Sequence, residues 1–381
     1  MQSCWVITSS ATEGASVPIA ERRPECTGQA NSVARTARVK SEDLNPDYQL
    51  TTRRRIAPAI ALFFLSPLIA EFMLGNVAID GLVALFILAP MYGGGALLIR
   101  EVARRTGRGW PTMVGLGLAY SVWEEAAVTQ LLFNPFYHGL ELTGAIIPGL
   151  GVSATQTINI LTLHTVWSVA VSIALVEAFV PNRRTTPWLG RFGLAVTVVV
   201  FLLGSAFIGY SEYEESGFFA SGPQLAGGVA AVAVLVAVAF TLPRDLRPSP
   251  AGVAPAPWLV LTAAFVATSL FMALLFELLP GWAGVAAWAA LVVVSVAVVS
   301  RWSRLHGWGD IHRLALAGGA LLTYAWSAFP QVPVVGAKGT VDSVGNIIFG
   351  AFAVALPAVA AVRLQKSRQP SNGGPNLNGE A

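Results

Sequence analysis

The chain has 381 residues, of which 54% are hydrophobic and only 12% are charged. A soluble globular chain carries roughly a quarter charged residues, so this composition excludes an ordinary soluble domain and favours a membrane protein. The net charge of +3 comes from basic residues spread over many short segments, which argues against a nucleic-acid partner. No phosphate-binding loop occurs in the sequence, which argues against ATP-driven transport within this chain.

The two ends of the chain are polar. Residues 1–55 contain several arginines and no apolar core of the kind found in a secretory signal, so we predict a disordered cytoplasmic tail there. Residues 363–381 are predicted to form a second disordered cytoplasmic tail. Cys4 and Cys26 lack the spacing of a metal site, and a reducing compartment disfavours a disulfide between them.

Ten apolar segments lie between these tails, each long enough to cross a hydrocarbon core of about 30 Å. Residues 56–362 therefore read as a transmembrane helical domain, and the predicted fold class is all-α, a polytopic bundle of about ten spans. The spans are predicted at residues 56–74, 81–99, 111–133, 155–180, 192–210, 221–242, 258–279, 282–300, 314–329 and 344–362.

The distribution of basic residues predicts the orientation of this bundle. Lys338 is the only one of the 24 Lys and Arg residues in the connections on one side; the others fall on the opposite side. Basic residues mark the cytoplasmic side, so both termini are predicted to be cytoplasmic. We therefore expect a multi-pass protein of the cell (cytoplasmic) membrane, whose principal partner is the lipid bilayer.

Five glutamates lie within the predicted spans, and no Lys or Arg does. A bare charge in hydrocarbon is expensive, so each carboxylate needs a proton, an interface, or a polar or metal partner. Glu71, Glu177 and Glu277 are near the ends of their spans, where water and headgroups reach, and we predict interfacial positions for them. Glu124 and Glu125 lie deeper and need a different explanation.

Glu124 and Glu125 lie about 12–14 Å below the outer end of the third span, at 1.5 Å per residue. The fourth span runs in the opposite direction and brings His164, the only histidine within a span, to the same depth. Two adjacent carboxylates do not easily ionise together, which is a setting for acid–base or metal chemistry. The sequence therefore predicts a buried polar site between the third and fourth helices, with Glu124, Glu125 and His164 as candidate catalytic residues.

Several hydroxyl groups surround this site in the sequence. Thr129 follows Glu125 by one turn, and Ser168 follows His164 on the same helix face, so both are candidates to orient the ionisable groups. Tyr120 and Ser121 precede the carboxylates by one turn. The alternative is a structural clasp, in which the same polar groups only pin the two helices together.

The outer connection, residues 134–154, is long and partly apolar, and we predict that it folds back over the outer mouth as a re-entrant or interfacial segment. His138 would then join Glu125 and His164 as a candidate ligand of a divalent metal such as Zn²⁺. A solvated His138 without a ligand role is the alternative.

The sequence Glu124-Glu125-Ala-Ala-Val-Thr129 resembles the EExxxR motif of the CAAX-protease and bacteriocin-processing intramembrane peptidases, with Thr129 in place of Arg. Ile160-Leu-Thr-Leu-His164 is similar to the FxxxH motif of that family, with Ile in place of Phe. Read as the HxxxN/D motif, His164-Thr-Val-Trp-Ser168 has Ser in place of Asn or Asp. No later span contains a histidine. The resemblance implies a glutamate and histidines that activate a water, together with a metal.

The sequence leaves the activity undetermined, with three hypotheses for the site. The first is a peptidase-like hydrolase, with Glu124 or Glu125 as general base and His164 as ligand or electrostatic partner. The second is a proton-coupled permease, although the absence of an internal repeat weakens it. The third is a non-catalytic scaffold. The run Gly93-Gly94-Gly95 marks either a hinge or a close helix crossing.

Overall fold

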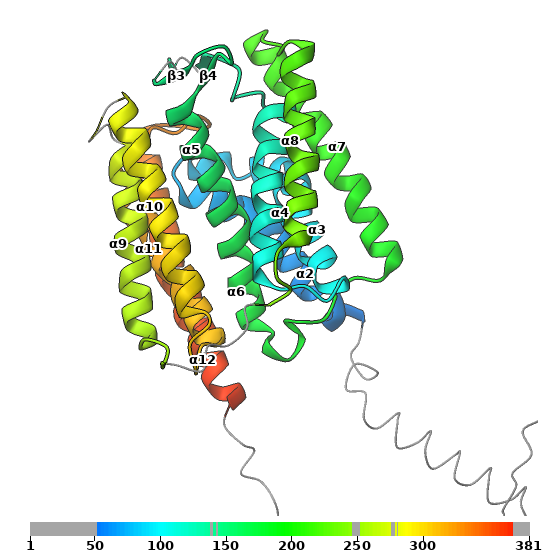
Figure 1. Cartoon of the computed structure of the whole chain (residues 1–381), viewed down its shortest axis with the longest axis vertical. Coiled ribbons are helices and arrows are strands. Elements are labelled where there is room, and N and C mark those ends of the chain that lie inside the picture. Colours follow the sequence, from blue (N-terminus) through cyan, green and yellow to red (C-terminus); the bar gives the residue numbers. More distant parts are fainter. Residues whose placement is uncertain are drawn as a thin grey trace, which may run out of the picture. The chain divides into compact units, whose positions relative to one another are not determined.

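The computed structural model describes residues 52–137, 140–141, 144–245, 252–275, 279 and 281–368. The description below concerns the unit that begins at Arg53. This unit is built from helices with two short hairpins (Figure 1), which confirms the predicted all-α polytopic bundle. His138, Glu277 and both predicted tails beyond residues 52–368 lie outside the described residues.

The helices follow one another closely along the chain, and three of them contain π-helical turns, η2, η4 and η5. In order, the elements are α2 (Thr52–Pro67), η2 (Leu68–Met73), η3 (Ile79–Gly81), α3 (Ala84–Arg105), α4 (Trp110–Val122), η4 (Trp123–Val128), α5 (Ala154–Leu163), η5 (His164–Val171), α6 (Ser172–Phe179), η6 (Pro181–Arg183), α7 (Arg191–Ser216), α8 (Gly222–Thr241), α9 (Pro257–Leu275), α10 (Gly281–Trp302), α11 (Asp310–Ser327) and α12 (Thr340–Arg368).

The connection between η4 and α5 folds as two antiparallel hairpins. They are β1 (Phe136–Tyr137) with β2 (Leu140–Glu141), and β3 (Ile146–Ile147) with β4 (Val152–Ser153). Ser153 caps α5 by accepting a hydrogen bond from the backbone N–H of Gln156, at 3.2 Å. The described residues of this connection thus form two small β-ribbons.

Among the residues that the structure describes, eight helical segments are long and apolar enough to cross a membrane. They are Ile56–Met73, Ala84–Arg105, Ala154–Phe179, Arg191–Ser216, Gly222–Thr241, Pro257–Leu274, Gly281–Trp302 and Thr340–Ser367. The other two predicted spans are also helical, as α4 with η4 and as α11. The first of these two contains Glu124 and Glu125, and the second begins at Asp310.

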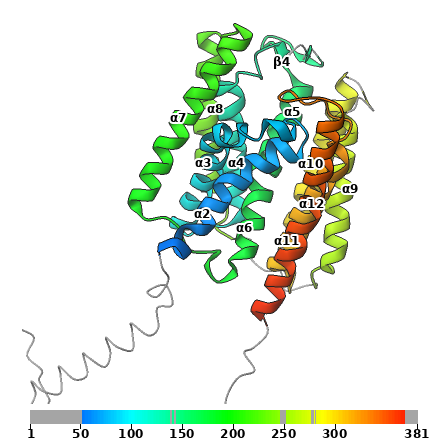
Figure 2. The same cartoon turned by 180° about the vertical axis from the view of Figure 1, so that it is seen from behind.

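Helices α5 and α6, joined by η5, lie between two groups of helices in both views (Figures 1 and 2). On one side α3 packs on α7 and α4 packs on α8; on the other, α11 packs on α9 and α12. Trp167 of η5 stacks on Tyr324 of α11, with ring centroids 4.9 Å apart, and donates a hydrogen bond to the carbonyl oxygen of Ala320. The central helix is therefore anchored to the second group by buried aromatic packing.

The Gly93–Gly95 run is a point where three helices approach α3 closely. A Cβ atom at Gly93 would overlap the carbonyl oxygen of Phe63 in α2, and one at Gly95 would overlap the ring of Tyr120 in α4. Gly94 faces α7. Small residues let membrane helices pack backbone to backbone. Close packing thus explains the run.

A buried charge cluster joins α3, α6 and the segment after η6. Arg100 is fully buried and donates hydrogen bonds to Glu101 at 2.9 Å and to Glu177 at 3.1 Å. Its guanidinium lies 3.2 Å from the centre of the Trp188 ring. Arg104 adds a second ion pair to Glu177 at 2.7 Å. Three backbone carbonyls complete the shell of Arg100, those of Arg183, Arg184 and Thr186.

This cluster differs from the sequence prediction in two respects. Helix α3 continues to Arg105, so Arg100 and Arg104 belong to a helix and not to a solvated connection. Glu177 lies at a helix end, as predicted, but only 5% of it is exposed. Its carboxylate is paired with two arginines, Arg100 and Arg104.

Candidate functional site

The polar site lies where η4 and η5 face each other. Gly117 of α4 packs against Val169 of η5, where an added Cβ atom would lie 3.3 Å from the side chain. Ser121 and Thr165 share a hydrogen bond of 3.0 Å between their hydroxyl oxygens, one turn from the acidic pair. This close crossing brings the side chains of the two π-helical segments into contact.

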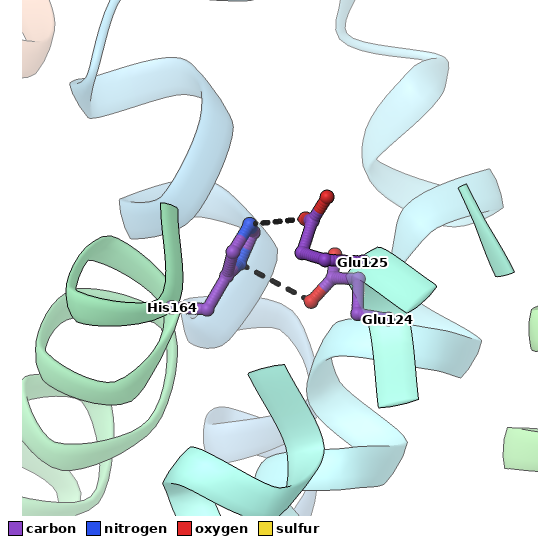
Figure 3. Close-up of side chains that lie close together, drawn as sticks. All are labelled: Glu124, Glu125 and His164. Carbon is purple, nitrogen blue, oxygen red and sulfur yellow. Dashed lines mark ion pairs between the residues drawn. The ribbon is translucent and has the colours of Figure 1, made fainter. Parts of the chain in front are cut away.

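Glu124, Glu125 and His164 meet as the sequence predicted. The imidazole lies between the two carboxyl groups, with dashed lines to both in Figure 3. Nε2 of His164 is 2.9 Å from Oε1 of Glu125, and Nδ1 is 3.2 Å from Oε2 of Glu124. Glu124 is fully buried, Glu125 is 2% exposed and His164 is 8% exposed. The site is a desolvated carboxylate–imidazole–carboxylate arrangement inside the bundle.

Two of the predicted hydroxyls hold the site in place. Thr129 donates a hydrogen bond of 3.0 Å to Oε2 of Glu125, and the hydroxyl of Ser168 lies 3.1 Å from Nδ1 of His164. Tyr120 is buried nearby, and its hydroxyl has no hydrogen-bond partner among the described residues. The Glu125 side of the site is therefore more fully hydrogen-bonded than the Glu124 side.

Glu124 is the least satisfied member of the site. Its Oε2 faces the imidazole, and the hydroxyls of Tyr92 and Tyr120 lie beside the carboxyl group, but no contact to either oxygen has the geometry of a good hydrogen bond among the described residues. Leaving a buried carboxylate without hydrogen bonds is costly, so the group requires a proton or a cation close by. Glu124 is thus the group best placed to accept a proton inside the site.

The structure adds Glu71, Tyr92 and Asn76 to the residues that the sequence predicts for the site. The Tyr92 hydroxyl donates a hydrogen bond of 2.5 Å to Glu71, and the Asn76 amide donates one of 3.1 Å to the other oxygen of Glu71. The ring of Tyr92 packs against that of His164, with centroids 5.7 Å apart. In the sequence, Tyr92 is a polar aromatic residue inside a predicted span and directly precedes Gly93, and this position is the feature that could have indicated a buried hydrogen bond.

The Tyr92–Glu71 hydrogen bond is expected to stabilise the packing of η2 against α3. Tyr92→Phe removes the hydroxyl and leaves a partly buried carboxylate short of one donor, so we expect a loss of about 1–3 kcal/mol in the free energy of unfolding. Denaturation of the purified protein measures it. Tyr210→Phe, at a 62% exposed position, is the matched control. Equal stability of the two variants would contradict this assignment.

All three π-helical segments carry site residues. Glu71 lies in η2, Glu124 and Glu125 in η4, and His164 begins η5. A π-turn widens the helix locally, and such turns are frequent at functional sites. The convergence of three of them on one polar cluster distinguishes this region from the rest of the described bundle.

The donor set fits a divalent cation. Glu124, Glu125 and His164 each offer one ligand atom, and these atoms lie within 4.8 Å of one another. Carboxylate oxygens and an imidazole nitrogen are ordinary ligands of Zn²⁺. Only one nitrogen of an imidazole can bind a given ion, so the other would be left to a carboxylate or hydroxyl, here Glu124 or Ser168. His138, the remaining predicted ligand, lies outside the described residues.

Comparison with known proteins adds one match. A family profile described as an uncharacterized membrane protein family matches residues 60–329, which contain every described residue of the site. No curated protein matches the chain, and no solved structure does. The resemblance of residues 124–129 to intramembrane peptidases stays a prediction.

Proposed function

Because the chain belongs to an uncharacterized membrane protein family, we propose its activity from the site itself: a membrane-embedded hydrolase centred on Glu124, Glu125 and His164. The observation that carries the proposal is the fully buried carboxylate of Glu124, which faces an imidazole at 3.2 Å. A desolvated base beside a fixed imidazole suits the removal of a proton from water.

The three residues take different roles in this proposal. Glu124 is the general base, because its fully buried carboxylate lies 3.2 Å from the imidazole. His164 supports it electrostatically through Nδ1. Glu125, held by Thr129, faces the opposite ring nitrogen and fixes the imidazole. Preorganised groups in a dry site need little rearrangement as charge develops on the reacting atoms.

A divalent metal such as Zn²⁺ is part of the proposal as a cofactor. His164 and Glu125 would hold it, with His138 as a weaker candidate. When bound, such an ion polarises a carbonyl oxygen and makes water a better nucleophile at neutral pH. The support is the donor set within 4.8 Å and the resemblance of the Glu124-Glu125 sequence to a peptidase motif.

The test is the effect of Zn²⁺ on thermal stability of the purified protein. We expect Zn²⁺ to stabilise the wild type by about 2.7 kcal/mol at about 100 times its Kd, and to leave Glu125→Gln and His164→Ala unaffected. Glu214→Gln and His306→Ala, which remove the same kinds of group from exposed positions, are the matched controls. They should respond to Zn²⁺ like the wild type.

The opposite result identifies a structural clasp. If Zn²⁺ has no effect on the wild type, and both site variants only lose stability, the polar groups pin η4 to η5 and the hydrolase proposal fails. Such variants would still be informative, because a clasp predicts a stability loss that is independent of added metal.

A proton-coupled permease is the second candidate, favoured by one observation. Each ring nitrogen of His164 faces a different carboxylate, so the imidazole can exchange a proton with either side. Proton uptake into vesicles containing the purified protein distinguishes the two functions. Uptake by the wild type that is lost in Glu124→Gln, without any response to Zn²⁺, would favour the permease.

We also propose that the bundle lies in the cytoplasmic membrane with both termini in the cytoplasm. The support is the single basic residue, Lys338, in the connections on one side of the spans.

A further inference from the structure

A groove of about 430 Å³ lies between η4 and α7, on the side of η4 that faces away from His164. Trp123 and Ala127 of η4 form one wall. Leu202, Ala206 and Tyr213 of α7 lie on the other, and their spacing places them on one face of that helix. The groove is therefore separate from the polar site, although η4 contributes to both.

Two polar contacts of the groove walls are made within the protein. Trp123 donates a hydrogen bond of 3.3 Å from its indole nitrogen to the hydroxyl of Ser205. The side-chain oxygen of Gln130 accepts a hydrogen bond of 2.6 Å from the backbone N–H of Ala220. Most of the other residues that line the groove are apolar or aromatic. A molecule that fills this space must be apolar where it contacts them.

The groove opens toward the hydrocarbon of the bilayer. Helix α7 is one of the eight segments able to span a membrane, and only 22% of its most apolar window is buried within the protein. Leu202 is 50% exposed on this surface. A concave apolar surface that faces lipid tails fits a single acyl chain.

The end of the groove has a distinct chemistry. Tyr210 and Tyr213 line it there, 62% and 46% exposed, and the exposed carboxylates of Glu214 and Glu215 follow on the same helix. Lys338 is the only basic residue in the connections on this side. An ammonium group is attracted both to the face of a tyrosine ring and to a carboxylate. An anionic headgroup would be repelled.

From these observations we propose that the groove binds one acyl chain of an amine-bearing phospholipid, with its ammonium group at Tyr210 and Tyr213 beside the acidic end of α7. The chemical class is that of phosphatidylethanolamine. The site is independent of the proposed hydrolase activity, because none of its walls is formed by Glu124, Glu125 or His164.

Quenching of Trp123 fluorescence by brominated acyl chains tests the proposal. The full-length protein is reconstituted into phosphatidylglycerol vesicles that contain the same small fraction of brominated phosphatidylethanolamine or brominated phosphatidylglycerol. Subtracting the signal of Trp123→Phe isolates this tryptophan from the others. We expect occupancy of the groove by the amine-bearing lipid to exceed that by the anionic lipid about two- to fivefold.

Further variants test the binding of the acyl chain separately from the binding of the headgroup. Ala206→Phe fills the groove and should abolish the quenching by both lipids, whereas Val199→Phe, on the same helix but outside the groove, should leave it unchanged. The double variant Glu214→Gln with Glu215→Gln should keep the quenching and lose the preference. Equal quenching by both lipids in the wild type, or no effect of Ala206→Phe, would overturn the proposal.

Discussion

Arg100→Ala is expected to destabilise the protein by about 3–5 kcal/mol, because it leaves the partners of a fully buried cation uncompensated. The guanidinium holds two carboxylates, those of Glu101 and Glu177, and three backbone carbonyls of the segment that follows α6. Its loss would also remove the group that covers the Trp188 ring. Thermal or chemical denaturation of the purified protein measures the effect.

Two comparisons make this result specific. Arg301→Ala removes the same side chain from an exposed position at the end of α10 and should change stability by less than about 0.5 kcal/mol. Arg100→Lys keeps the positive charge but loses the planar fork, so it should recover only part of the stability. If Arg100→Ala were as stable as Arg301→Ala, the cluster would have no role in holding α3 to α6.

Gly93→Val is expected to have the second large effect, because it pushes α2 away from α3. Even one added carbon overlaps the carbonyl oxygen of Phe63, and backbone cannot move aside as a side chain can. Overpacking of a core costs typically 1–3 kcal/mol and sometimes more. Since η2 continues α2, the displacement should also disturb the contact of Glu71 with Tyr92. Reduced stability and reduced yield of folded protein are the measurements.

The matched control for this variant is Gly227→Val. Gly227 lies in α8, where an added Cβ atom would meet nothing within 4 Å. Both substitutions put a β-branched residue at a helical glycine, so both make the same change in helix propensity. They differ only in the space available to the new side chain. A similar effect of the two would show that helix propensity, and not the crossing of α2 and α3, decides the outcome at Gly93.

The bundle and the central site were predictable because both follow from hydropathy. The positions of the apolar segments gave the helices, and the antiparallel order of consecutive spans was enough to place His164 at the depth of Glu124 and Glu125. Ser168 and Thr129 also followed from helical spacing, and both make the expected contacts. These predictions needed only contacts within one helix or between two consecutive helices.

The features that the sequence did not predict are contacts between distant helices. Tyr92 and Glu71 come from α3 and η2, and nothing in their spacing places them near the fourth span. The sequence places Arg100 in the connection after the span at residues 81–99. A count of basic residues cannot distinguish a solvated arginine from one that is buried against Glu177 and Trp188. Pairing of this kind depends on how helices cross.

The π-helical segment η5 has a consequence for the phase of its helix, because it lies between α5 and α6. A π-turn accommodates one residue more than α-helical geometry allows, so α5 and α6 are offset by about 100° in register. Deleting a single residue from η5 would restore one continuous α-helix and change which faces of α5 and α6 meet their neighbours. The position of His164 between the two carboxyl groups therefore depends on the length of this helix as well as on its residues.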